Sequence, residues 1–244
     1  MDLIFDLETI PRPDLSEPNE RVLAYGTDRL KDPKKIKAKR EENRRKWYAD
    51  AAVDPRRCAI VLAGVAQNDG PMSIAAACPR PDGWDAHASH AATIARTSAL
   101  NVFWCGDEAT LLRTLWRWLG DQDVTRLVGF SHRGFDLPVI FERSVRLHVR
   151  ATRTWNRARF RSDLGILDWQ EVLCDHGNLS MLGWSLSYYV ADYGLDYIEP
   201  FGEGKDLPAK WEEGDIAWCV KHLAADLAMT RALHSYQLDR GRKV

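Results

Sequence analysis

Short apolar runs, each about the length of one strand, alternate along the chain with longer stretches whose apolar residues follow helical spacing. The turn signal Asn68-Asp69-Gly70-Pro71 separates two of these runs, so we expect them to form an antiparallel pair. The expected strands cover approximately residues 2–8, 58–67, 73–78, 101–105 and 126–130.

Helices are expected where apolar residues recur every three or four positions. Asp107 suits the N-cap of one helix, and Gly194 suits the end of another. Residues 79–99, rich in Pro, His, Ala and Ser, are interpreted as a loop. The expected helices cover residues 33–50, a segment after Asp107, a segment from Asp136, residues 180–192 and residues 215–238. A strand meander followed by alternating strands and helices indicates a single α/β domain over residues 1–244. The basic segment at about 28–50 would form a helical insertion in it.

The composition is that of an ordinary globular protein, with 244 residues, 45% hydrophobic, 28% charged and a net charge of −1. No apolar run reaches the ~18 residues that a membrane span needs, and no basic leader marks a signal peptide. The five scattered cysteines include no Cys-x-x-Cys pair, so neither a zinc site nor a disulfide framework is indicated. We therefore expect a cytoplasmic protein with no membrane partner.

Positive charge is concentrated in two segments. Residues 28–46 hold ten Lys and Arg against four acidic residues, and residues 143–161 hold seven Arg and no acid. Each could be a solvated helix face, and the mixed signs of the first, with Lys37 and Glu41 four apart, suit that alternative. In the second, aromatic residues such as Trp155 stand among the arginines, as on surfaces that hold phosphates and stack bases. The second segment in particular indicates a nucleic-acid partner.

Four acidic residues stand where a charge is costly, at the ends of apolar strands or inside an apolar helix. Asp6 and Glu8 are two apart in the first strand and share one face, with Leu7 turned toward the core. Asp136 follows a later strand, and Asp226 lies in an apolar part of the last helix. Taken singly, each could be a strand-end cap, a helix-start charge or half of an ion pair with an arginine.

Four carboxylates at one point would repel one another by several kcal/mol unless cations lay between them. Hard oxygen ligands favour Mg²⁺ or Mn²⁺, and two such ions about 3.5–4 Å apart can hydrolyse phosphodiester bonds. His222 stands four residues before Asp226 and shares its helix face. A neutral imidazole could accept a proton from water, and the alternative is that it only orients the water or Asp226.

Three segments resemble the motifs of the DEDD 3′–5′ exonucleases, in the form found in the predicted 3′–5′ exonucleases related to the polymerase B proofreading domain. FDLETIP is similar to the first motif, GFSHRGFDLPVI to the second, and HLAAD falls where the third lies. The resemblance implies a ribonuclease H-like α/β fold with a five-stranded mixed sheet, its second strand antiparallel, flanked by helices. It also implies that two divalent cations, Mg²⁺ or Mn²⁺, are held by Asp6, Glu8, Asp136 and Asp226.

The resemblance further implies an exonuclease that releases nucleoside 5′-monophosphates from single-stranded 3′ ends, with DNA favoured over RNA and DNA repair as a setting. There are two departures from the family pattern. His222 stands where the family has Tyr, whereas the sister group has its His at the position of Lys221, and Ser131 replaces a common Asn. The alternatives are a non-catalytic nucleic-acid-binding module, a ribonuclease H-like endonuclease and an RNA-trimming exonuclease.

Residues beside these motifs and in the arginine-rich segment are candidates for contact with the substrate. His132 is also a reserve candidate for the base, because it is close in sequence to Asp136. The candidate substrate contacts are Leu7, Thr9, Ser131, His132, Phe135, Arg143, Arg150, Arg153 and Trp155.

Overall fold

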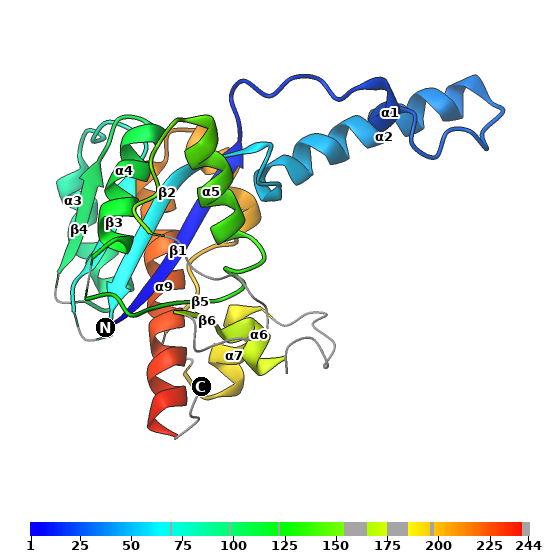
Figure 1. Cartoon of the computed structure of the whole chain (residues 1–244). Helices are drawn as coiled ribbons and strands as arrows, with labels where there is room; N and C mark the ends of the chain where they lie inside the picture. Colours follow the sequence, from blue (N-terminus) through cyan, green and yellow to red (C-terminus); the bar gives the residue numbers. More distant parts are fainter. Residues whose placement is uncertain are drawn as a thin grey trace.

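A computed structural model of the chain describes residues 1–68, 70–97, 99–121, 123–153, 165–174, 185–195 and 198–240. In this part of the chain a sheet of six strands, in the order β4-β3-β2-β1-β5-β6, is covered by helices on both faces (Figure 1). The strands are β1 (Asp2–Pro11), β2 (Cys58–Gln67), β3 (Met72–Ala76), β4 (Leu100–Trp104), β5 (Arg126–Gly129) and β6 (Ile166–Asp168).

Strand β2 runs opposite to the rest of the sheet. It pairs antiparallel with both β1 and β3, whereas β4 is parallel to β3, β5 to β1 and β6 to β5. The ribonuclease H-like α/β fold with an antiparallel second strand is therefore confirmed. The expected number of five strands is corrected to six, because the short strand β6, which the apolar pattern did not predict, pairs with β5 at the edge of the sheet.

The prediction of a loop over residues 79–99 was wrong, since helix α3 (Trp84–Ile94) lies there. Two parallel neighbours such as β3 and β4 need a crossover between them, and α3 is part of that connection. Trp84 and Ala91 are buried, and the Trp84 ring packs edge-on against Trp104 of β4 at 5.1 Å. Four of its eleven residues are alanine, the best helix former, and packing against the rest of the fold stabilises the helix further.

The other helices agree better with the expected pattern. Asp107 caps α4 and accepts a hydrogen bond from the N–H of Thr110 at 2.7 Å. The helix expected over residues 180–192 begins at Leu186, after the cap residue Ser185, and residues 180–184 lie outside the described residues. The helices are α1 (Glu20–Leu23), α2 (Pro33–Ala49), η1 (Asp50–Val53), α4 (Glu108–Leu119), α5 (Asp136–Arg146), α6 (Trp169–Leu173), α7 (Leu186–Asp192), η4 (Gly204–Asp206), α8 (Leu207–Glu212) and α9 (Ile216–Asp239), besides α3.

The alternation of side chains along β1 divides them between two apolar cores. Leu3, Phe5 and Leu7 belong to the core beneath α4 and α5, whereas Ile4 belongs to the core that α9 covers. Because side chains alternate between the two faces of a strand, Asp6 and Glu8 lie on the α9 side.

Helices α1 and α2 form an arm that stands away from the sheet, with the C-terminal end of α2 at the sheet and its N-terminal end far from it (Figure 1). No residue of α2 is buried. In the part of the chain that the structure describes, no helix combines the length and the hydrophobicity needed to cross a membrane.

Candidate metal centre

The close approach of α9 to β1 and β2 depends on a glycine. Asp6 pairs in register with Gly64 of β2. A Cβ atom on Gly64 would lie 2.4 Å from Cδ1 of Leu227 and 3.2 Å from Cδ2 of Leu223, both on α9. Glycine therefore lets α9 lie directly on the sheet beside Asp6. Gly64 was not predicted as a site residue, although a glycine inside a buried apolar strand is a recognisable signal.

Three potential ligand groups from β1 and α9 meet at this contact. Glu8, His222 and Asp226 each offer one ligand atom, and these atoms all lie within 4.8 Å of one another. The Nε2 atom of His222 is 3.5 Å from Oε1 of Glu8 and 3.6 Å from Oδ2 of Asp226. Helical spacing of four residues places His222 and Asp226 on the same face, so their proximity follows from the local geometry of α9.

Asp6 and Asp136 complete an acidic cluster, by which we mean Asp6, Glu8, Asp136 and Asp226. Burial raises the pKa of Asp6 to about 8, and the nearby Asp226 carboxylate raises it as well. Burial also raises the pKa of Asp226 to about 7. For Glu8 and Asp136, burial and then the charge of Asp6 raise the pKa well above its ordinary value. The four carboxyl groups thus share one poorly solvated region and oppose one another's ionisation.

The surroundings of the acidic cluster fit divalent cations. Among the described residues, no lysine or arginine forms an ion pair with any of the four carboxyl groups, and His222 is the basic side chain nearest to Glu8 and Asp226. Carboxylate oxygens are the ligands that Mg²⁺ and Mn²⁺ prefer, and imidazole nitrogen is a further possible ligand.

The ring of His222 is held in one orientation. Its Nδ1 atom lies 2.6 Å from the carbonyl oxygen of Phe201, and because a carbonyl can only accept, Nδ1 carries the hydrogen and donates it. Nε2 is then unprotonated and faces the acidic cluster in the neutral ring. The indole of Trp218 stacks on the imidazole, with ring centroids 5.2 Å apart and planes at 16°. Gly202 has φ +74°, and a Cβ there would lie 2.2 Å from Cζ2 of Trp218, so glycine is required beside the stack.

Asp168, at the end of β6, is a second residue that the sequence analysis missed. Its carboxylate accepts hydrogen bonds from the backbone N–H groups of Ser131, at 2.9 Å, and Arg133, at 3.0 Å. Ser131 has φ +65°, so this turn is strained and needs such support. The turn leads directly into α5, whose first residue is Asp136. Asp168 therefore positions Asp136. The sequence feature that could have revealed Asp168 is an acidic residue at the end of an apolar strand.

Three candidate substrate contacts are buried in the fold instead. Leu7 is packed in the core beneath α4 and α5. Thr9 is buried, and its hydroxyl donates to the carbonyl of Ala52 at 2.6 Å. His132 is fully buried, and its two ring nitrogens have no hydrogen-bond partner within the described residues. Burial lowers the pKa of His132. Side chains enclosed in this way support the structure, and His132 is shut off from the water that a base would need.

The arginines of the second basic segment also differ from one another in the structure. Arg143 is buried, and its guanidinium donates to both carboxylate oxygens of Glu108, at 2.7 and 2.6 Å. It therefore ties α5 to α4 and is corrected from a phosphate contact to a structural residue. Arg153 donates to the carbonyl of Val124, whereas Arg150 is exposed. Of the remaining candidates, Ser131 and Phe135 are half-buried near Asp136, and Trp155 lies outside the described residues.

Comparisons with known proteins agree with this geometry. A search of curated proteins found no significant match. Among solved structures, the fold is similar to the family B DNA polymerase from the hyperthermophilic archaeon Pyrobaculum calidifontis, with a TM-score of 0.60 and 14% identity. That alignment covers 97% of this chain and 24% of the polymerase chain, so this chain spans about a quarter of its neighbour's length.

A family model matches the segment that contains the second motif. The matched residues, 87–177, include Asp136 and the missed Asp168. The first and third motifs lie outside the match. Over residues 87–177 the chain matches the predicted 3′–5′ exonucleases related to the exonuclease domain of PolB, which confirms the resemblance read from its motifs.

Proposed function

We propose that this chain is a metal-dependent 3′–5′ exonuclease that hydrolyses single-stranded nucleic acid, with DNA favoured, to nucleoside 5′-monophosphates. The observation that carries this proposal is the meeting of Glu8, His222 and Asp226, with ligand atoms within 4.8 Å of one another. Clustered carboxylates without lysine or arginine partners bind cations readily, because cations relieve their repulsion. The match of residues 87–177 to a family of predicted exonucleases supports the nuclease chemistry.

Asp6, Glu8, Asp136 and Asp226 would hold two divalent cations, Mg²⁺ or Mn²⁺. When bound, the cations stabilise the negative charge that develops on the phosphate and on the leaving 3′ oxygen. The carboxylates come from β1, α5 and α9, which are fixed to one another by packing. Their spacing is therefore set before substrate binds, which is the condition for effective electrostatic catalysis.

His222 would accept a proton from the attacking water at Nε2. The hydrogen bond from Nδ1 to the carbonyl of Phe201 leaves Nε2 unprotonated on the side of the acidic cluster. The stacked indole of Trp218 keeps the ring in this plane. A tyrosine at the same position, with a pKa near ~10, would accept a proton poorly at neutral pH. Histidine thus suits the position better as a base than the residue usual in the family.

A digestion of 5′-labelled single-stranded DNA of about 30 nucleotides tests this proposal. With Mg²⁺ or Mn²⁺ we expect a ladder of products shortened from the 3′ end, and a chelator should stop the reaction. Asp226→Asn and Asp6→Asn should each lower the rate by about 10³-fold or more, since a lost metal ligand removes several kcal/mol of transition-state stabilisation. A parallel series with RNA measures the preference for DNA.

Asp239→Asn is the matched control, because Asp239 is an exposed acid at the C-terminal end of the same helix. It should leave the rate unchanged. Internal fragments would identify an endonuclease instead, and binding without cleavage would identify a non-catalytic module. Unchanged activity in Asp226→Asn, with the fold intact by circular dichroism, would overturn the assignment of the site.

A further inference from the structure

The basic segment of residues 28–46 is not uniform once it is folded. In its second half, acidic side chains pair with the cations. Arg40 donates to both carboxylate oxygens of Glu20, at 2.5 and 2.6 Å, and Arg44 lies 3.1 Å from Glu41. This half of α2 has the charge balance of an ordinary solvated helix.

The far end of the arm carries cations that lack such partners. We call these five exposed residues the basic tip, and within the described residues none of them forms an ion pair: Arg29, Lys31, Lys34, Lys35 and Lys37. Asp28 and Asp32 are the acids of the same stretch, which leaves residues 28–37 with a net charge of +3, five basic less two acidic. The Asp32 carboxylate accepts the backbone N–H of Lys34 at 2.9 Å and caps α2.

The arm is braced along its length although no residue of α2 is buried. At its root, Arg57 donates to the carbonyl of Trp47 at 2.5 Å and lies over the Trp47 ring at 4.9 Å. Farther out, the Asn43 amide donates to the carbonyls of Leu23 and Tyr25, at 2.9 Å each, and so joins α2 to the segment of α1. A helix without a buried residue adds little to the core, so folding alone does not account for it.

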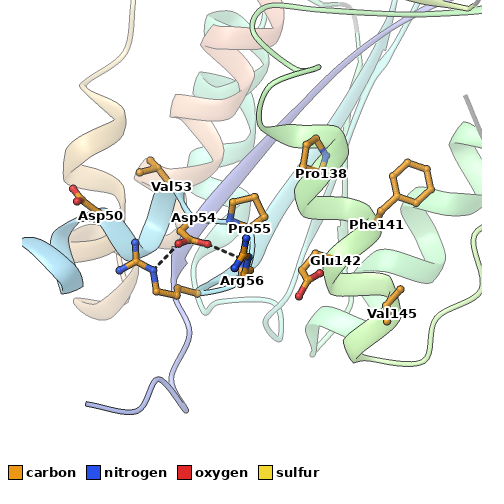
Figure 2. Close-up of a pocket in the computed structure, with 10 residues that line it drawn as sticks. Asp50, Val53, Asp54, Pro55, Arg56, Pro138, Phe141, Glu142 and Val145 are labelled. Atoms are coloured by element: carbon orange, nitrogen blue, oxygen red, sulfur yellow. Dashed lines mark hydrogen bonds and ion pairs between the residues drawn. The ribbon is translucent and has the colours of Figure 1, made fainter. Parts of the chain in front are cut away.

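A groove of about 900 Å³ lies between the root of the arm and α5 (Figure 2). Figure 2 shows Asp50 and Val53 on the arm side and Phe141, Glu142 and Val145 on α5. The groove contains both acidic and basic side chains, so it offers no net positive field to a phosphate backbone. Val53 and Val145 are exposed apolar side chains on its opposite sides. Phosphate attraction in this part of the molecule is therefore concentrated in the basic tip.

We infer that the basic tip binds the phosphate backbone of the nucleic-acid strand whose 3′ end lies at the acidic cluster. This inference rests on the proposed function. The 17 residues of α2 place the tip about 25 Å from the root of the arm, at 1.5 Å per residue. At ~3.4 Å per stacked nucleotide this corresponds to about seven nucleotides. The tip thus distinguishes long strands from short ones, because a strand of about four nucleotides at the site does not span this distance.

The triple variant Lys34→Gln/Lys35→Gln/Lys37→Gln tests the inference. Its dissociation constant for single-stranded DNA of about 30 nucleotides, measured by fluorescence anisotropy with chelator present, should rise roughly tenfold. The slope of log affinity against log salt should fall by about 2, because each phosphate contact contributes ~0.7 for a single strand. The kcat/KM for a tetranucleotide with Mn²⁺ should not change. The matching triple Lys→Arg variant, which keeps the charges, should bind like the parent.

Arg80→Gln/Arg113→Gln/Arg117→Gln is the matched control, since it removes three exposed cations elsewhere on the molecule. It should retain affinity for the long strand. Equal weakening in this control, or full affinity in the Lys→Gln variant, would overturn the role of the tip. If the parent protein binds the long strand through the tip but cleaves no substrate with either metal, the proposed function fails and the binding role of the tip stands.

Discussion

The acidic cluster and the α1–α2 arm are both rich in charge, but their surroundings are opposite. The carboxyl groups of Asp6 and Asp226 lie where α9 packs on the sheet, and burial raises their pKa to about 8 and about 7. On the arm, the guanidinium of Arg40 holds the pKa of the Glu20 carboxyl below its usual value, and both groups are in water. A charged group costs free energy in the acidic cluster and almost none on the arm.

This difference shows that the place of a charge in the fold decides what it can do. In the acidic cluster, repulsion among the carboxylates would be the source of an affinity for cations, because bound cations would relieve it. On the arm, water screens the charges, so they act on a polyanion by attraction that depends on salt. We therefore expect changes in the cluster to affect both catalysis and stability, and changes on the arm to leave the fold intact.

The largest effect in this comparison is expected from His222→Ala, which removes the proposed proton acceptor from the site. We expect kcat on single-stranded DNA to fall by roughly 10²–10⁴-fold, the usual contribution of a general base. His87→Ala, at an exposed histidine on α3, should have no effect. In a plot of rate against pH, His222→Tyr should lack the acid limb that protonation of the imidazole causes. An unchanged acid limb would show that histidine is not the base.

Gly64→Val tests whether the approach of α9 creates the site. The added side chain would overlap Leu227 and Leu223, so α9 must move away from Asp6. We expect overpacking to cost roughly 1–3 kcal/mol of unfolding free energy, measured by urea denaturation. The rate should fall by roughly 10²-fold, since displaced catalytic groups lose their alignment. Ser73→Val, at a half-buried position of β3, serves as the control, and a fully active Gly64→Val protein would contradict this account.

The charge of Asp226 should make the metal-free protein less stable as pH rises. Between the ordinary carboxyl pKa of 3.8 and the folded value of about 7, the unfolded chain has released this proton while the folded chain keeps it. The free energy of unfolding therefore falls as pH rises across this interval. Asp226→Asn should flatten the slope and stabilise the metal-free protein by roughly 1–3 kcal/mol at pH 8.

Thermal unfolding with chelator, followed from pH 4 to pH 8, measures this effect. Adding Mg²⁺ at pH 8 should stabilise the parent protein and should stabilise Asp226→Asn much less. Asp239→Asn should keep the slope of the parent. If the two variants have the same pH dependence, burial of the charged Asp226 carboxylate does not destabilise the folded protein as the structure indicates.

The smallest effect is expected on the arm. Arg40→Gln breaks the exposed pair with Glu20, and such pairs contribute little because water screens both charges. We expect no resolvable change in the unfolding midpoint or in kcat on a tetranucleotide. A clear loss of stability would show that the arm belongs to the folding unit and would weaken the contrast with the acidic cluster.

Much of the fold could be predicted from local patterns. The bounds of α2 and the cap of α4 at Asp107 agree with the sequence analysis, and so does the antiparallel pair β2–β3. Helix α3 was missed because its burial comes from contacts with β4 and α9, which no local pattern reports. The number of strands was wrong because β6 has only three residues, too few for a local pattern, and forms by pairing with β5.

The site was predictable where it depends on repeating geometry and unpredictable where it depends on packing. A run of seven arginines looks uniform in sequence, yet Arg143 is buried against Glu108 while Arg150 is exposed. Asp168 was missed because its role depends on the backbone of a turn that lies far away in sequence. Gly64 was missed because its importance comes from a helix that begins about 150 residues later.

The sequence by itself determined that Asp6 and Glu8 share one strand face and that His222 and Asp226 share one helix face, because the periods of strand and helix fix these relations locally. Only the tertiary structure decided that the two pairs meet, since that distance depends on the packing of α9 against the sheet at Gly64. It also decided which cations of residues 28–46 are paired and which are not. Local geometry fixes which side chains of one strand or helix face the same way, whereas the packing of the whole core fixes which distant segments lie close together.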